Sequence, residues 1–214
     1  MIKVAIDTST KLAGVCVQPP DGAPLERTWH SRQNHCRELV PSMMELLKEC
    51  DAEPRDIGLV AVALGPGRFS AVRVGIATAI GLCLPRNLQP VGVPSYAVEA
   101  EPHRHALPLH VLLPAARREI AWFELSASLE RPAASGLADA DRLVETLPPR
   151  ARICGEGVNM LNGEHGKLEL AGDRDAPRSP AALLRIVARR AAGERFPLAP
   201  IYAKQPSIAT PQRG

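Results

Sequence analysis

The chain of 214 residues is long enough for one large domain or two small ones with a buried core. Its 45% hydrophobic and 23% charged residues are typical of a soluble globular protein, and a net charge of +3 is too small to indicate nucleic-acid binding by itself. The sequence has no run of about 18 apolar residues, so we expect no membrane span. Five cysteines without a C-x-x-C pair indicate free thiols and a cytoplasmic location.

Three antiparallel strands are predicted to open the chain. Two short apolar runs, residues 2–6 and 12–17, lie on either side of the turn-forming residues 7–11 and indicate a β-hairpin. A Pro-Pro-Asp-Gly turn then leads to a third strand near residues 25–30.

Helices and strands are then predicted to alternate. Apolar positions within 36–50 follow the spacing of an amphipathic helix, in which Pro41 predicts either a start near residue 38 or a kink. Residues 57–64 form a near-continuous apolar run, as in a strand buried on both faces. A helix over about 70–84 and a strand at 91–93 follow.

The second half of the chain is less clearly patterned. Residues 101–108 are predicted to be a linker, and strands are expected at 109–113 and 119–125. Residues 126–150 are expected to be irregular or poorly helical. The last helix is predicted to have Ser179 as its N-cap, Pro180 at its first position and Gly193 just past its end.

This order of elements matches an α/β protein with the ribonuclease-H-like layout, a mixed β-sheet with helices on its faces. We expect two lobes. Residues 1–102 form the N-terminal lobe, and residues 103–214 form a second, diverged lobe with the last helix and the tail.

The tip of the opening hairpin, Asp7-Thr8-Ser9, is the first candidate site. In actin-like ATPases an acidic residue at this place holds metal-bound water, and N–H groups of the turn face phosphates. The alternative is an Asx-turn that only closes the hairpin, and the tripeptide alone favours this alternative.

A glycine motif at 65–75, GPGRFSAVRVG, is the second candidate. Gly65 and Gly67 allow close approach of the backbone to a ligand or a neighbour, and they lead into a helix N-terminus, which suits anions. A structural turn between strand and helix explains the glycines equally well. The motif is not a P-loop, because no Gly-Lys-Ser/Thr follows.

The glycine motif is similar to the GPGSFTGxRxG signature of the TsaB (YeaZ) family, part of the glycoprotease-like (peptidase M22-like) superfamily. Weaker landmarks follow in the family's order: Ile6-Asp7-Thr8-Ser9, His35-x-x-x-Leu39-Val40-Pro41, Gly92-Val93-Pro94-Ser95, Gly155-Glu156-Gly157 and Pro200-Ile201-Tyr202. Residues 114–122 depart from the family's DARxGEVYW: the acidic residue, the first Arg and the Gly are gone, while Glu119 and Trp122 remain.

The resemblance implies a two-lobed actin-like ATPase fold and a non-catalytic scaffold or activator. In the family this subunit binds the catalytic subunit TsaD, and TsaE joins as an ATPase. TsaD transfers threonylcarbamoyl to N6 of a tRNA adenosine next to the anticodon, so tRNA is reached through the complex. We expect no catalytic residue, no metal site and no tightly bound cofactor, with ATP or ADP at the junction with TsaD as an option. The alternative is an independent ATPase, small-molecule kinase or glycoprotease-like hydrolase of the same fold.

The resemblance also implies two sets of site residues. The family's partner surface uses the first two helices, which also mediate homodimers. We therefore predict a partner or dimer surface formed by Leu39, Val40, Met43, Leu47, Ala71, Gly75 and Ala79. Nucleotide- or phosphate-facing positions are predicted at Asp7, Thr8, Ser9, Gly65, Gly67, Arg73, Gly155 and Gly157. On this hypothesis, Gly75→Leu abolishes association while the monomer stays folded.

Overall fold

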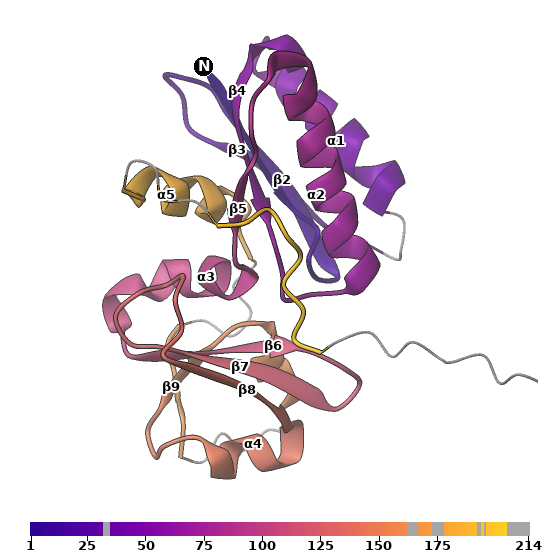
Figure 1. The fold of residues 1–214 in the computed structure, drawn as a ribbon. Helices are drawn as coiled ribbons and strands as arrows, with labels where there is room; N and C mark the ends of the chain where they lie inside the picture. The colour runs from indigo at the N-terminus through magenta and orange to yellow at the C-terminus, as the bar shows by residue number, and fades with distance from the viewer. Residues whose placement is uncertain (32–34, 162–166, 173–177, 192–193, 195, 205–214) are drawn as a thin grey trace, which may run out of the picture.

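Two five-stranded mixed β-sheets, stacked with helices between and outside them, make up the computed structural model (Figure 1). The structure describes residues 1–31, 35–161, 167–172, 178–191, 194 and 196–204. The predicted place of Gly193 after the last helix lies outside the described residues.

The first sheet has the strand order β3-β2-β1-β4-β5. Its strands are β1 (Ile2–Asp7), β2 (Leu12–Gln18), β3 (Leu25–His30), β4 (Ile57–Ala63) and β5 (Val91–Val93). Strand β1 pairs antiparallel with β2 and parallel with β4, which confirms the predicted opening meander. Side chains alternate along β1, because successive residues of a strand point to opposite faces.

The second sheet has the order β10-β9-β6-β7-β8. Its strands are β6 (Leu109–Pro114), β7 (Glu119–Leu125), β8 (Ala134–Asp139), β9 (Arg152–Cys154) and β10 (Glu169–Leu170). Its first strand, β6, lies in the middle with an antiparallel neighbour on one side and a parallel one on the other. The second sheet therefore repeats the topology of the first.

The α-helices of the described residues form three layers around the sheets, as Figure 1 shows. Helices α1 (His35–Glu49) and α2 (Phe69–Cys83) cover the outer face of the first sheet. Helices α3 (Ser95–Ala100) and α5 (Ala181–Arg189) lie between the sheets and share one core with both. Helix α4 (Ala140–Thr146) covers the outer face of the second sheet. The described residues also form short 3-10 helices: η1 (Pro54–Asp56), η2 (Leu84–Arg86), η3 (Glu101–Ala106) and η4 (Glu156–Met160).

Several predicted elements are corrected by the structure. The segment 126–150 contains β8 and α4, so the prediction that it is irregular or poorly helical was wrong. The predicted linker 101–108 is largely the 3-10 helix η3. Pro41 lies inside α1, which begins at His35. The N-cap of α5 is Pro180 and not Ser179.

The end of the chain returns to the first sheet. Helix α5, which the sequence places with the second lobe, packs against β1, β4 and β5. The strands present small side chains to it, including Ala5 and Ala61, and these small side chains leave room for a close-packed helix. The inner layer of helices thus belongs to both lobes.

Helix α2 lies unusually close to the sheet. A Cβ atom added at Gly75 would lie 2.6 Å from Thr8 Oγ1 and 3.6 Å from Ile6 Cγ2. Thr8 Oγ1 donates a hydrogen bond to the Ala71 carbonyl at 2.6 Å, so it is held in place. Ala71, Gly75 and Ala79 are all buried. The small-residue stripe therefore faces the protein's own sheet, whereas the sequence analysis assigned it to a partner helix.

The segment Phe69–Arg86, which comprises α2 and η2, is long and apolar enough by length and composition alone to cross a membrane. About one third of it is buried in the protein. Val72, Ile76 and Cys83 of this segment pack in the core under the first sheet, as in the core helix of a globular protein.

Two glycines of α2 should respond oppositely to the same substitution. We expect Gly75→Ala to destabilise the protein by about 1–3 kcal/mol, because the added methyl group overpacks the contact with Thr8. Nothing lies within 4 Å of a Cβ at Gly81, so Gly81→Ala should stabilise the helix by up to about 1 kcal/mol. Urea denaturation of both variants measures these changes in stability. Stabilisation by Gly75→Ala would show that α2 is not in close contact with Thr8 at Gly75.

Candidate functional site

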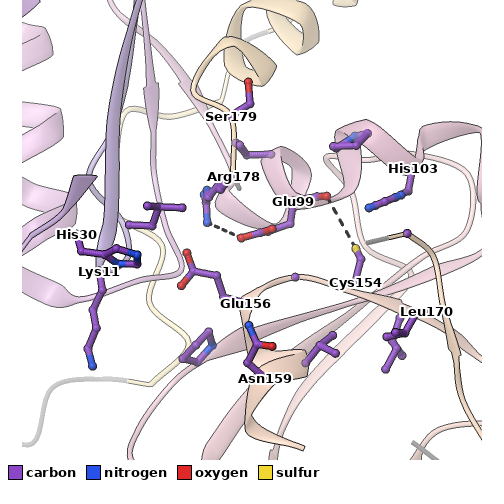
Figure 2. Close-up of a pocket in the computed structure, with 18 residues that line it drawn as sticks. Lys11, His30, Glu99, His103, Cys154, Glu156, Asn159, Leu170, Arg178 and Ser179 are labelled. Atoms are coloured by element: carbon purple, nitrogen blue, oxygen red, sulfur yellow. Dashed lines mark hydrogen bonds and ion pairs between the residues drawn. The ribbon is translucent and has the colours of Figure 1, made fainter. Parts of the chain in front are cut away.

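A cleft of about 640 Å³ opens between the two lobes (Figure 2). Lys11 lines it from the turn between β1 and β2, His30 from the end of β3, Glu99 from α3, and Glu156 from the start of η4. Arg178, which precedes α5, lies at its inner end. The cleft thus brings together charged side chains from four separate parts of the chain.

The Arg178 side chain lies at the centre of a buried charge network. Its Nη1 donates to Glu99 Oε1 at 3.0 Å, and its Nη2 donates to the Ser95 carbonyl at 3.3 Å. Its Nε lies 2.7 Å from Asp7 Oδ2, an ion contact with angles outside the hydrogen-bond range. The side chains of Arg178 and Asp7 are each 3% exposed and that of Glu99 10%. Asp7 Oδ1 accepts bonds from the Ser9 amide and hydroxyl at 3.0 and 2.7 Å.

Burial and like charges shift the titration of this network. Burial raises the pKa of Glu99 from 4.5 to about 7, Arg178 opposes this shift, and Glu156 and Asp7 add to it. Burial lowers the pKa of Arg178, but the carboxylates of Asp7, Glu99 and Glu156 together raise it above its ordinary value. The guanidinium therefore stays charged, whereas Glu99 changes its charge near neutral pH.

A direct hydrogen bond joins the two lobes at the mouth of the cleft. Thr10 Oγ1, just past the hairpin tip, donates to Glu156 Oε1 at 2.6 Å. Gly155 has φ 97°, and a Cβ at this position would collide with the Leu112 carbonyl oxygen. A Cβ at Gly157 would lie 2.9 Å from the same oxygen. Both glycines are therefore explained by close packing on β6.

The glycine motif covers the hairpin tip. Gly65 has φ 93°, and a Cβ there would collide with the Ile201 carbonyl, while a Cβ at Gly67 would collide with the Ser9 carbonyl. The Arg68 amide donates to the same Ser9 carbonyl at 2.8 Å. The Arg68 amide at the start of α2 is thus engaged within the chain.

The predicted phosphate-facing residues do not converge on one place. Gly155 lines the cleft, whereas Arg73 lies on the exposed side of α2. The Arg73 guanidinium carbon lies 3.8 Å from the Phe69 ring centroid, and its Nε donates to Tyr202 Oη at 3.0 Å. The Phe69 and Tyr202 rings stack with their centroids 5.0 Å apart. Arg73 therefore fastens the C-terminal segment to α2.

A metal-bound nucleotide at Asp7 does not fit these residues. Both carboxylate oxygens of Asp7 already have contacts, one with Ser9 and one with Arg178. In the part of the chain that the structure describes, no three His, Cys, Asp or Glu side chains are placed to hold a metal ion. The hairpin tip therefore matches the Asx-turn interpretation better than the phosphate-binding one.

The predicted partner surface lies mostly inside the subunit. Leu39, Met43 and Leu47 are buried in the core between α1 and the first sheet, and Val40 alone of the predicted α1 positions is exposed. With the buried stripe of α2, six of the seven predicted positions are buried within the subunit. The exposed large apolar residues of these helices are different ones: Val40, Met44, Phe69, Ile80 and, directly after α2, Leu84.

Sequence reasoning missed the charged residues of the cleft. Glu99 had a signal, since it is the only charged residue in the otherwise apolar or neutral α3 sequence SYAVEA. Arg178 had none, because it follows a polar stretch in which buried and solvated charges look alike. Its partners are distant in sequence and come together only through the topology.

The sequence of the chain is similar to a known protein family and to named proteins. The family model described as "TsaD: tRNA N6-adenosine threonylcarbamoyltransferase" matches residues 29–144, more than half of the chain. The chain is 31% identical over 105 residues to the "tRNA threonylcarbamoyladenosine biosynthesis protein TsaB" of Bacillus subtilis, an alignment that covers 49% of this chain and 46% of that protein. The same-named Escherichia coli protein is 31% identical over 98 residues, with 46% and 42% covered. The chain thus spans less than half the length of these two curated relatives.

A solved structure extends the likeness to nearly the whole chain. YeaZ from Pseudomonas aeruginosa superimposes with a TM-score of 0.70 at 22% identity, covering 94% of this chain and 99% of that one. This likeness confirms the predicted actin-like, ribonuclease-H-like fold with two lobes.

The raised pKa of Glu99 predicts a pH-dependent stability. Because the folded pKa is raised, the protonated carboxyl stabilises the protein below about pH 4.5, and this stabilisation is lost as the pH rises through about 7. We therefore compare the free energy of unfolding of Glu99→Gln with that of wild type. The difference between them should shift in favour of the variant by roughly 2 kcal/mol from pH 5 to pH 8. Urea denaturation at both pH values measures this, with the exposed Glu145→Gln as control. Equal pH dependence of wild type and Glu99→Gln would contradict the assignment.

Proposed function

We propose a non-catalytic role in tRNA threonylcarbamoyladenosine biosynthesis for this chain, which belongs to the TsaB (YeaZ) family within the broader family of the matching TsaD model. The chain binds the catalytic subunit TsaD as a scaffold or activator, and TsaE joins the assembly as an ATPase. It acts in the cytoplasm and reaches tRNA through the complex. The observation that carries the binding role is an exposed apolar face on the two helices that cover the first sheet.

This docking face consists of Val40 and Met44 on α1, Ile80 on α2 and Leu84 directly after α2. Their exposed fractions are 43, 42, 44 and 75%. Large apolar side chains that protrude from neighbouring helices favour a protein partner, because their burial removes apolar surface from water. Gly81 lies beside Ile80 and has open space where a side chain would be, so a partner helix can approach the backbone there.

The charge network supports the non-catalytic part of the proposal. An actin-like ATPase, kinase or hydrolase would need Asp7 free to hold metal-bound water, and here Arg178 and Ser9 engage it. Catalysis is therefore assigned to TsaD. ATP or ADP, where it takes part, binds at the junction with TsaD and not beside Asp7.

The same docking face offers a route to homodimers when the chain is alone. A homodimer that uses Val40, Met44, Ile80 and Leu84 would compete with TsaD for them. Addition of TsaD should then convert dimers into heterocomplexes, without a ternary species that retains the dimer contact.

Substitutions on the docking face should separate association from folding. We expect Leu84→Asp and Gly81→Leu each to weaken TsaD binding at least tenfold, because one places a charge in the interface and the other blocks close approach. Their melting temperatures should stay within a few degrees of wild type, since both positions are exposed. Isothermal titration calorimetry with TsaD measures the affinity.

The control for this experiment is Leu137→Asp, which changes a 41% exposed leucine of β8 on the other lobe. It should leave TsaD affinity unchanged. Full affinity of both Leu84→Asp and Gly81→Leu would exclude the docking face as the TsaD-binding surface.

A further inference from the structure

The interlobe cleft carries its own cation. We propose that the Arg178 guanidinium is a resident cation held beside Asp7 and Glu99, and that its removal uncovers a latent cation-binding site. This inference concerns the inner layer of the molecule and does not rest on the docking role proposed above.

The position of the guanidinium is set by three oxygen atoms from two elements, β1 and α3. Asp7 lies at the end of β1, Ser95 begins α3, and Glu99 is one turn further along α3. Their oxygens lie 2.7, 3.3 and 3.0 Å from the three guanidinium nitrogens of Arg178. A set of carboxylate and carbonyl oxygens around one buried cation is also the ligand chemistry that hard metal ions prefer.

The surrounding charges require a cation at this place. Asp7 and Glu99 are buried carboxylates that face the same point, and the Glu156 carboxylate acts on both Glu99 and Arg178. Without Arg178 their mutual repulsion and loss of hydration would be uncompensated. The network therefore depends on positive charge, whichever group supplies it.

The contact with Arg178 also keeps metal ions away from the Asp7 carboxylate. Its Nε covers Asp7 Oδ2, while Ser9 engages Oδ1, so an entering metal ion must first displace a side chain that is almost fully buried. The chain should then take up neither Mg²⁺ nor Mg–ADP beside Asp7. Loss of the guanidinium should reverse this, because the cavity it leaves is lined by anionic oxygens.

Chemical rescue tests the proposal on the full chain. We expect Arg178→Ala to lower the melting temperature by roughly 10 °C, as the loss of one partner of a buried ion pair does. Guanidinium chloride at a few millimolar, well below denaturing concentrations, should restore part of this loss saturably, and MgCl2 should do likewise. Sodium chloride at equal ionic strength should not, and wild type should respond to neither cation.

The matched control is Arg185→Ala, whose half-exposed guanidinium lies 3.6 Å from the buried carboxylate of Glu101. It should show no rescue by guanidinium. An Arg178→Ala protein that melts like wild type, or that guanidinium and magnesium fail to stabilise, overturns the proposal.

A second pair of variants covers the case in which Arg178→Ala does not fold. If Arg178 neutralises Asp7, then Asp7→Asn combined with Arg178→Met should melt higher than Arg178→Met alone, because the uncompensated anion is gone. A double variant that melts at or below Arg178→Met would contradict the resident-cation role. Calorimetric binding of Mg–ADP by wild type with a Kd below about 1 mM, lost in Asp7→Asn, would also contradict it.

Discussion

One guanidinium buried between two carboxylates holds the inner layer of this protein together. Arg178 contacts Asp7 at the end of β1 and Glu99 in α3, and three residues later the chain begins α5. Because an unpaired buried charge is far more costly than a paired one, this contact fixes where α5 starts and how α3 faces the hairpin tip. Helices α3 and α5 share one hydrophobic core with both sheets.

Because Arg178 occupies the inner side of the first sheet, the two faces of this sheet differ in what they leave exposed. On the inner face, polar groups that an ATPase of this fold would direct at a nucleotide are engaged by Arg178, Ser9 and the glycine motif. On the outer face, α1 and α2 bury their small and apolar stripes against the sheet and leave other apolar side chains in water. The inner face is therefore occupied by the protein's own groups, whereas the outer layer of helices leaves apolar side chains exposed.

Prediction from the sequence succeeded where the signal is local. Alternating apolar residues and turn signals located β1 to β7, and glycine and alanine at 71, 75 and 79 indicated a close backbone approach by α2. The sequence analysis placed a partner's helix opposite this stripe, whereas the structure places the protein's own sheet there. The spacing of small residues indicates a close approach but does not distinguish a helix from a sheet on the other side. Strand β8 gave no signal, since none of its residues is buried. The pairing of Arg178 with Asp7 depends on a topology that no local pattern encodes.

The most direct test of this account is a crystal structure of the full chain with TsaD, grown in the presence of magnesium and ATP. The account predicts TsaD against Val40, Met44, Ile80 and Leu84, with the Arg178 guanidinium still in contact with Asp7 and Glu99. A metal ion or phosphate group beside Asp7, with Arg178 displaced from the cleft, would contradict it.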